Sequence, residues 1–198
     1  ISLMVEAGLI PRVVDLDALA IENIYELNYL QGGQPREVQV SEGEGKKEGE
    51  EKSEIVALVN IGAQVININI LKDGVTTYIR DMSNYGGNRY TQALQRELNI
   101  GAQQAEALKL GVDLAGFSPV KISPIIQAVT EEMGREINKS FEFYRTNFGE
   151  EDIHKVMLSG GCANIPGIDR FLGEMLYVDV EVINPFRNVE VNSKSFDP

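Results

Sequence analysis

The sequence contains few of the residues from which disulfides and metal centres are built. Its 198 residues include one cysteine, Cys162, and one histidine, His154. A single cysteine cannot form an internal disulfide, and a lone histidine without cysteine companions does not make a metal cluster. These absences exclude a disulfide-stabilised secreted module and a metal site of the cysteine-histidine type. They favour a reducing compartment, so we expect a cytoplasmic protein.

Basic residues and long apolar runs are also scarce. The chain has 18 lysines and arginines against 30 aspartates and glutamates, which gives a formal net charge of -12. Nucleic acids and anionic membranes bind basic surfaces, so neither is expected as the main partner. No run of about eighteen apolar residues occurs, which argues against direct membrane insertion. The first residues lack the basic start of a signal peptide.

What the chain does have is glycine at the end of predicted strands. Residues 155–158 predict a strand, Ser159-Gly160-Gly161 comes next, and residues 165–176 have the pattern of a helix. A glycine pair at such a place lets the backbone approach a flat ligand, because no Cβ intervenes. An ordinary tight turn has the same composition, so this motif alone leaves both interpretations open.

A second glycine turn lies upstream, between strands. Apolar and polar residues alternate over 66–70, and Asp73-Gly74 is typical of a two-residue hairpin. The sequence therefore predicts three short strands, with Gly62-Ala63-Gln64 joining the first two. A Walker loop or a dinucleotide fingerprint would need a helix directly after the glycines, so both are excluded.

Much of the remaining sequence has the periodicity of helices. It predicts helices over 17–29, 87–98 and 103–110, and a long helix that begins at Ser123-Pro124. The long helix carries one apolar stripe, formed by Ile126, Val129, Met133, Ile137, Phe141, Tyr144 and Phe148.

Two further segments are less regular. Residues 1–5 have the composition of a strand interior, and 9–15 predict a turn and a short strand. Residues 41–54 are almost wholly polar and acidic, so they cannot offset their own ordering entropy and are expected to form a mobile surface loop.

In their order, these motifs resemble the second half of the actin/Hsp70/sugar-kinase ATPase superfamily. The motifs are Asn60-Ile61-Gly62-Ala63-Gln64 between strands, Tyr85-Gly86-Gly87 opening a helix, Ser159-Gly160-Gly161 after a strand, and Ile165-Pro166-Gly167. Within the superfamily the chain is similar to the PilM family of type IV pilus assembly, with the division protein FtsA more distant. The resemblance implies an α/β fold, an actin-like ATPase (ribonuclease H-like) domain with a mixed sheet and flanking helices.

The resemblance also implies a division of the chain. Residues 1–30 are expected to be a remnant of a first domain, 31–54 an acidic insert, 55–183 the second actin-like ATPase domain, and 184–198 a C-terminal return segment. The first phosphate loop of the superfamily has no counterpart here, and the chain does not begin with Met. We therefore expect a fragment of a two-domain protein.

By the same resemblance, the chain should carry part of an ATP site, with Mg²⁺ in the full-length protein and weak or no binding in the fragment. The family's Glu-x-x-Lys pair would be Glu136, toward the ribose, and Lys139, toward the adenine. Gly160 and Gly161 would form a flat wall that Asn164 closes. For Glu136 and Lys139, an ordinary surface ion pair is the alternative interpretation.

The phosphate side of the predicted site consists of Asn60, Gly62, Ala63, Gln64 and Gly87, whose backbone N–H groups could hold phosphate oxygens. The superfamily usually has Asp where this chain has Asn60. An amide cannot act as a carboxylate base and is a poorer ligand for a hard cation. The sequence therefore assigns no catalytic residue and predicts at most weak ATPase activity.

The function implied by the resemblance is that of a nucleotide-binding adaptor of type IV pilus assembly, peripheral at the inner membrane through its partners. It would link the cytoplasmic N-terminal tail of a PilN-like membrane protein to other pilus assembly proteins. Three alternatives stay open. They are a nucleotide-free scaffold, a small-molecule kinase whose catalytic Asp would lie in the first domain, and a filament-forming protein similar to FtsA.

Overall fold

The computed structural model describes residues 2–30, 53–149 and 152–189. The acidic insert predicted over 31–54 lies outside these residues except for its last two positions. The end of the predicted return segment, 190–198, lies outside them as well.

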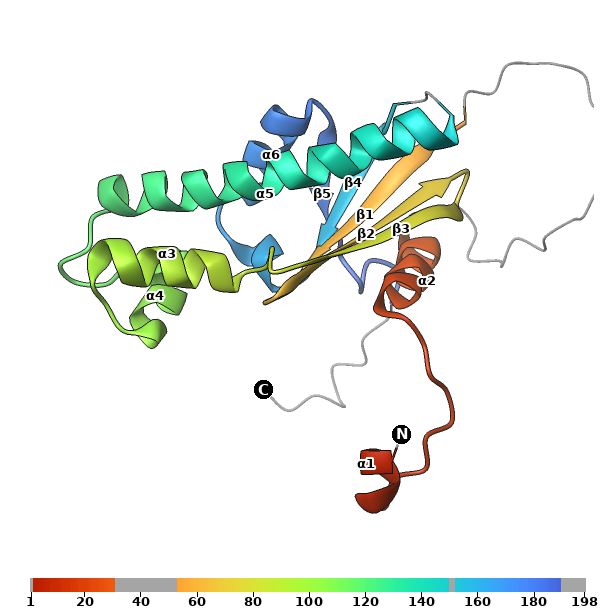
Figure 1. The fold of residues 1–198 in the computed structure, drawn as a ribbon, viewed down its shortest axis with the longest axis horizontal. Helices are drawn as coiled ribbons and strands as arrows, with labels where there is room; N and C mark the ends of the chain where they lie inside the picture. Colours follow the sequence, from red (N-terminus) through yellow and green to blue (C-terminus); the bar gives the residue numbers. More distant parts are fainter. Residues whose placement is uncertain (1, 31–52, 150–151, 190–198) are drawn as a thin grey trace, which may run out of the picture.

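A five-stranded mixed sheet is the centre of the fold (Figure 1). Its strands are β1 (Ile55–Ile61), β2 (Val65–Lys72), β3 (Val75–Ser83), β4 (Lys155–Ser159) and β5 (Asp179–Val182), in the order β3-β2-β1-β4-β5. The β1–β2 and β2–β3 pairs are antiparallel, whereas β1–β4 and β4–β5 are parallel. The predicted three-strand meander is confirmed. Asp73 and Gly74 join β2 to β3 with φ values of 53° and 79°, as a tight hairpin turn requires.

The two faces of the sheet are covered unequally. Helices α5 (Pro119–Phe148) and α6 (Ile168–Leu176) cover one face, and α2 (Asp17–Tyr29) packs on the other (Figure 1). On the α2 face, Tyr25 packs against Val56, Leu58 and Met157. Because β1 is buried on both faces, its sequence is an almost continuous apolar run instead of an alternating one.

The long helix α5 begins five residues earlier than predicted. Ser118 is its N-cap and accepts a hydrogen bond from the N–H of Val120 at 3.3 Å, and Pro119 occupies the first turn. The chain has two Ser-Pro pairs, and both suit a helix start. Pro124 lies inside the helix, where its missing N–H leaves the carbonyl of Val120 without a helical donor. Val120 is exposed, so water can satisfy that carbonyl.

The apolar stripe of α5 is confirmed along most of its length. Val129, Met133, Ile137, Phe141 and Tyr144 are buried against the sheet and α6. The stripe ends before the helix does, because Phe148 is 49% exposed and stacks on Tyr144 with ring centroids 5.6 Å apart.

Three local predictions are wrong. Residues 2–6 form a short helix, α1 (Ser2–Glu6), and residues 9–16 are neither helix nor strand. A strand needs a partner, and in the described part of the chain none pairs with these segments, whereas a helical turn satisfies its own backbone. After β4 the chain makes a 3₁₀ turn, η1 (Gly161–Asn164), and α6 begins only after Gly167, whose φ is 75°. The predicted helices α3 (Asn88–Leu98) and α4 (Ala102–Lys109) are confirmed.

Candidate functional site

Three glycine turns meet at one edge of the sheet. Gly62 lies in the β1–β2 turn, Gly87 is the N-cap of α3, and Gly161 begins η1 after β4. Since β1 and β4 are parallel neighbours, the turns at their carboxyl ends lie side by side. The turns enclose a cavity of about 510 Å³, which we call the glycine cavity, lined by Gly62, Ala63, Gly87, Glu106, Lys109, Leu110, Gly161, Cys162 and Asn164.

Backbone hydrogen bonds hold two of these turns together. The N–H of Gly87 donates to the carbonyl of Gly62, and that of Asn88 donates to the carbonyl of Ala63, both at 2.8 Å. At Gly86, a Cβ would lie 2.5 Å from the Ala63 carbonyl, so the β3–α3 connection packs directly on the β1–β2 turn. The start of α3 is therefore fixed to the phosphate-side turn that the sequence predicted.

The Gly160-Gly161 pair has two different roles. Gly160 has a φ of 88°, and a Cβ there would lie 2.5 Å from both the Asn60 Oδ1 and the Ile61 carbonyl oxygen. Only glycine fits that position. At Gly161, in contrast, a Cβ would meet no atom within 4 Å, because it would point into open space. A side chain at Gly161 would thus occupy space that the protein itself leaves empty.

A buried lysine completes the glycine cavity. The side chain of Lys109, at the end of α4, is 10% exposed, and its Nζ lies 2.6 Å from the Glu106 Oε2. Lys109 also donates to the Thr91 hydroxyl at 3.4 Å, and that hydroxyl in turn donates to the Glu106 carboxylate. Burial acts to raise the pKa of Glu106, but hydrogen bonds from Lys109 and Thr91 outweigh it and lower that pKa. The Glu106 carboxylate is therefore ionised at neutral pH.

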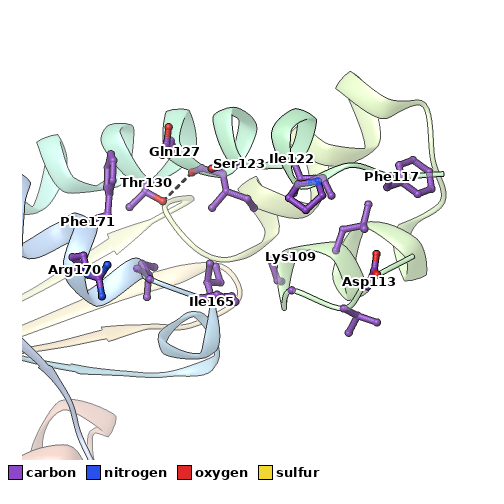
Figure 2. Close-up of a pocket in the computed structure, with 18 of the residues that line it drawn as sticks. Lys109, Asp113, Phe117, Ile122, Ser123, Gln127, Thr130, Ile165, Arg170 and Phe171 are labelled. Carbon is purple, nitrogen blue, oxygen red and sulfur yellow. Dashed lines mark hydrogen bonds between the residues drawn. The ribbon is translucent and has the colours of Figure 1, made fainter. Parts of the chain in front are cut away.

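A second cavity, of about 570 Å³, is also lined by Lys109 (Figure 2). It lies between the α4–α5 connection, the first turns of α5 and the start of α6, and we call it the apolar cavity. Its walls include Leu114, Phe117, Ile122, Ile165 and Phe171. Its polar groups include Gln127, Thr130 and Arg170. Largely apolar walls with a few polar groups are typical of a small-molecule site.

The structure brings part of the predicted nucleotide site together. Gly62, Ala63, Gly87, Gly161 and Asn164 all line the glycine cavity. The remaining phosphate-side and wall residues lie within two positions of a lining residue in the chain without lining either cavity themselves. They are Asn60, Gln64 and Gly160.

The structure does not bring Glu136 and Lys139 to these cavities. They form an ion pair at 2.6 Å on the surface of α5, and the hydrogen bond to Glu136 raises the pKa of Lys139. Their side of α5 faces the end of β3, because the neighbouring Ser140 hydroxyl contacts the Met82 Sδ at 3.7 Å. The other side of the helix, with Gln127, lines the apolar cavity.

Glu106 and Lys109 were not predicted from the sequence, although they have the same Glu-x-x-Lys spacing. The Glu-x-x-Lys spacing was therefore visible in the sequence, but spacing alone does not show which helix lies beside the glycine turns. Cys162 was also unassigned. Burial raises the pKa of its thiol to about 11, and its Sγ donates to the Gly62 carbonyl at 3.9 Å. That thiol packs between two turns and is not poised to react.

Two kinds of feature are absent from the described residues. No group of three or more His, Cys, Asp and Glu side chains among them is placed to hold a metal ion. Within the same residues, no helix is both long and apolar enough to cross a membrane.

Comparisons with known proteins agree with this fold. A family model described as "Type IV pilus assembly protein PilM" matches residues 1–197. Among solved structures, a PilM-PilN type IV pilus biogenesis complex matches with 24% identity and a TM-score of 0.71, over 96% of this chain and 48% of that one. This chain therefore spans about half of that relative.

Two further structures show the same actin-like ATPase fold at lower similarity. The ethanolamine utilization protein EutJ from Carboxydothermus hydrogenoformans matches with 22% identity and a TM-score of 0.51, over 66% of this chain and 43% of that one. MreB 5 of Spiroplasma citri bound to AMPPNP matches with 16% identity and a TM-score of 0.50, over 65% and 48%.

Proposed function

The chain belongs to the PilM family of type IV pilus assembly proteins, and from this premise we propose that it is a nucleotide-binding adaptor of the pilus machinery. The proposal of nucleotide binding rests on one observation: the three glycine turns lie together beside the buried Lys109. Backbone N–H groups at glycine turns and a lysine ammonium are the donors that bind phosphate in proteins. The MreB relative is bound to a nucleotide analogue, AMPPNP.

In this proposal the two cavities divide the nucleotide between them. The glycine cavity takes the phosphates and the apolar cavity takes the base, because Lys109 lines both and stands at their junction. The apolar cavity, about 570 Å³, is of the size typical for small-molecule sites. Glu106 and Lys109 then take the place that the sequence analysis gave to Glu136 and Lys139.

The side chains of the glycine cavity could hold Mg²⁺ only together with a bound nucleotide, whose phosphates would supply further ligands. Mg²⁺ prefers oxygen ligands, and among the described residues that line the glycine cavity the side-chain oxygens are those of Asn164 and of Glu106, which is paired with Lys109. A bound Mg²⁺ would neutralise phosphate charge, with water and phosphate oxygens as its main ligands. Because the carboxylate that lines the cavity is held by Lys109, we propose at most weak ATPase activity.

The partner is inferred from family membership. The relative in the PilM-PilN complex is bound to PilN. We propose that the partner of this chain is the cytoplasmic tail of a PilN-like membrane protein, together with other pilus assembly proteins, and that the chain is cytoplasmic and peripheral at the inner membrane through them.

We also retain the division into a first-domain remnant (1–30), a second domain (55–183) and a return segment (184–198). Contacts between α2 and the return segment support it. The Asn188 N–H donates to the Asn28 Oδ1, and the Asn184 N–H donates to the Tyr29 hydroxyl, both at 2.8 Å. Helix α2 and the described part of the return segment are thus held together on one face of the sheet. This is the arrangement expected of two connections to a neighbouring domain.

Calorimetric titration of the full-length protein with ATP, in Mg²⁺, tests the nucleotide site. Gly161→Asp would place a carboxylate in the glycine cavity without a clash, since a Cβ there meets no atom within 4 Å. Gly101→Asp is the matched control, because Gly101 is the exposed N-cap of α4, where Asp is favoured, and lines neither cavity.

We expect binding by the unmodified full-length protein and by its Gly101→Asp variant, and at least about tenfold weaker binding by Gly161→Asp, since like charges repel strongly at short range. A folded full-length protein that does not bind ATP would favour the nucleotide-free scaffold, in which the Lys109–Glu106 pair only stabilises the fold. Equal binding by both variants would show that ATP binds elsewhere.

A further inference from the structure

The chain between α4 and the middle of α5 is loosely packed. No residue from 110 to 128 is buried, whereas the residues on either side of this stretch are. Figure 2 shows Phe117 and Ile122 on one side of the apolar cavity and Phe171 on the other. The stretch contributes four half-buried apolar side chains to the cavity, which are Leu114, Phe117, Ile122 and Ile126. It therefore forms a wall of the cavity without belonging to a buried core.

Few polar contacts hold this wall in place. We call residues 112–123 the α4–α5 segment. Its first N–H, that of Val112, donates to the Ala107 carbonyl of α4 at 3.0 Å. In the described part of the chain, no hydrogen bond or ion pair joins residues 113–123 to any element other than α5. The segment is held against α3 and α4 by apolar contacts, to which Leu114 and Phe117 contribute.

The two ends of the segment are a fixed point and a weak point. At Gly111, φ is 78° and a Cβ would lie 2.8 Å from the Pro166 Cγ, so the chain there rests directly on another wall of the cavity. At the other end, Pro124 lies inside α5 and has no N–H to donate to the Val120 carbonyl. Helices bend at prolines of this kind. The segment can therefore turn while its first end stays in place.

The helix is fixed again one and a half turns after Pro124. Thr130 is 2% exposed, and its hydroxyl lies 2.9 Å from the hydroxyl of Tyr90, which is fully buried. The single hydrogen of the Thr130 hydroxyl goes to the Ile126 carbonyl at 2.9 Å, and a bond of this type also favours a bend in a helix. A bend of α5 is thus confined to the residues between Pro124 and Thr130.

We propose that the α4–α5 segment is a lid of the nucleotide site. It turns at Gly111 and Pro124 and closes toward α6 when a base enters the apolar cavity. Closure removes Leu114, Phe117 and Ile122 from water, which stabilises the closed position. The nucleotide then leaves only after the lid opens, so the lid sets the rate of nucleotide exchange. This inference rests on the proposed nucleotide function and adds a step that controls it.

Hydrogen exchange of the full-length protein, with and without ATP and Mg²⁺, tests the lid. ATP should slow exchange throughout residues 112–123 by at least about fivefold, because the closed segment is held on both sides. Val120 and Lys121 are the decisive residues, since they line neither cavity and a base cannot protect them by contact. Unchanged exchange at these two residues, in a protein that binds ATP, would refute the lid.

Pro124→Ala tests whether the lid turns by bending α5. The substitution supplies the missing N–H and stiffens the helix, and Pro124 lines neither cavity. We expect a higher melting temperature and ATP dissociation about three- to tenfold faster, because the stiffened helix resists closure. Displacement of a fluorescent ATP analogue from the full-length protein by excess ATP measures this rate.

Pro119→Ala is the matched control, the same change in the same helix. Pro119 occupies the first turn of α5, where no helical hydrogen bond is missing. It also lines the apolar cavity, so a mere loss of contact would appear in the control first. We expect its dissociation rate to stay within about twofold of the unmodified rate.

Each failure has its own signature. An unchanged dissociation rate in Pro124→Ala, with a raised melting temperature, would refute bending at Pro124 while leaving the nucleotide site intact. If Pro124→Ala does not fold, hydrogen exchange at Val120 and Lys121 still decides whether the lid closes. A folded full-length protein that binds no ATP would refute the proposed nucleotide function itself.

Discussion

The two adjacent glycines at the end of β4 should respond in opposite ways to the same small change. Gly160→Ala adds a methyl group where φ is 88° and where a Cβ would lie 2.5 Å from the Ile61 carbonyl oxygen. Gly161→Ala adds the same methyl group where a Cβ meets no atom within 4 Å and φ is not in the left-handed region. The two variants therefore differ only in backbone conformation and local space.

The expected magnitude for Gly160→Ala has two parts. With ψ at 174°, its backbone lies in a region open essentially only to glycine, and placing another residue there costs about 1–3 kcal/mol. Relieving the overlap with backbone atoms of β1, which cannot rotate away as a flexible side chain would, adds about 1–3 kcal/mol. The sum, about 2–6 kcal/mol, is a large part of the 5–15 kcal/mol that stabilises a typical domain. Gly161→Ala should change stability by less than about 0.5 kcal/mol.

Urea unfolding monitored by circular dichroism, on both variants and the unmodified chain, measures the difference. We expect the midpoint of Gly160→Ala to fall strongly, with an unchanged slope, and that of Gly161→Ala to stay within error. Equal, small effects at both positions would refute the close approach of the β4 turn to Asn60 and Ile61. An equally large loss at Gly161 would refute the open space that the nucleotide proposal requires.

Three further predictions concern other contacts of the site and of α2. Because burial raises its pKa to about 11, Cys162 should resist iodoacetamide at pH 8 in the native protein and react rapidly in urea; equal rates would refute its packing between the turns. The lowered pKa of Glu106 contributes stability that is present above its unfolded pKa and lost as pH falls through its folded pKa. Glu106→Gln should therefore flatten the dependence of the urea midpoint on pH below about 5, by a modest amount because the side chain is 46% exposed. Asn28→Ala removes the acceptor of the Asn188 N–H and should cost about 1–2 kcal/mol and increase proteolysis after 184; unchanged proteolysis would show that other contacts hold the return segment.

The features that were predictable from the sequence are those set by neighbouring residues. Asp73-Gly74 specifies a hairpin by its backbone preferences alone, and period-two alternation over 66–70 marks a strand whatever lies beside it. The glycine turns were found for the same reason, because each lies next to a predicted strand or helix in the chain. Their meeting at one edge required the order of the motifs, which is why the resemblance to a known fold was needed to predict it.

The sequence could not decide between two copies where one local pattern occurs twice. Ser118-Pro119 and Ser123-Pro124 are equally good helix starts, and the choice between them depends on how the chain packs after the end of α4. Likewise Glu136 and Lys139 have the same spacing as Glu106 and Lys109, but only the latter pair ends a helix beside the glycine turns. A pattern in a single sequence does not tell which of two equivalent motifs lies beside a segment that is distant in the chain. Tertiary packing determines where the two Ser-Pro pairs and the two Glu-x-x-Lys pairs lie.

Electrostatics explains why Lys109 matters more than its single charge suggests. The chain carries a formal net charge of -12, so a phosphate approaches against an unfavourable overall field. Lys109 is already paired with Glu106 at 2.6 Å, and that pair leaves little net positive charge in the glycine cavity. An ammonium has three donors, of which Glu106 and Thr91 take two. A phosphate that enters must either use the third donor or displace Glu106, so the carboxylate that holds Lys109 in place also competes with the nucleotide for it.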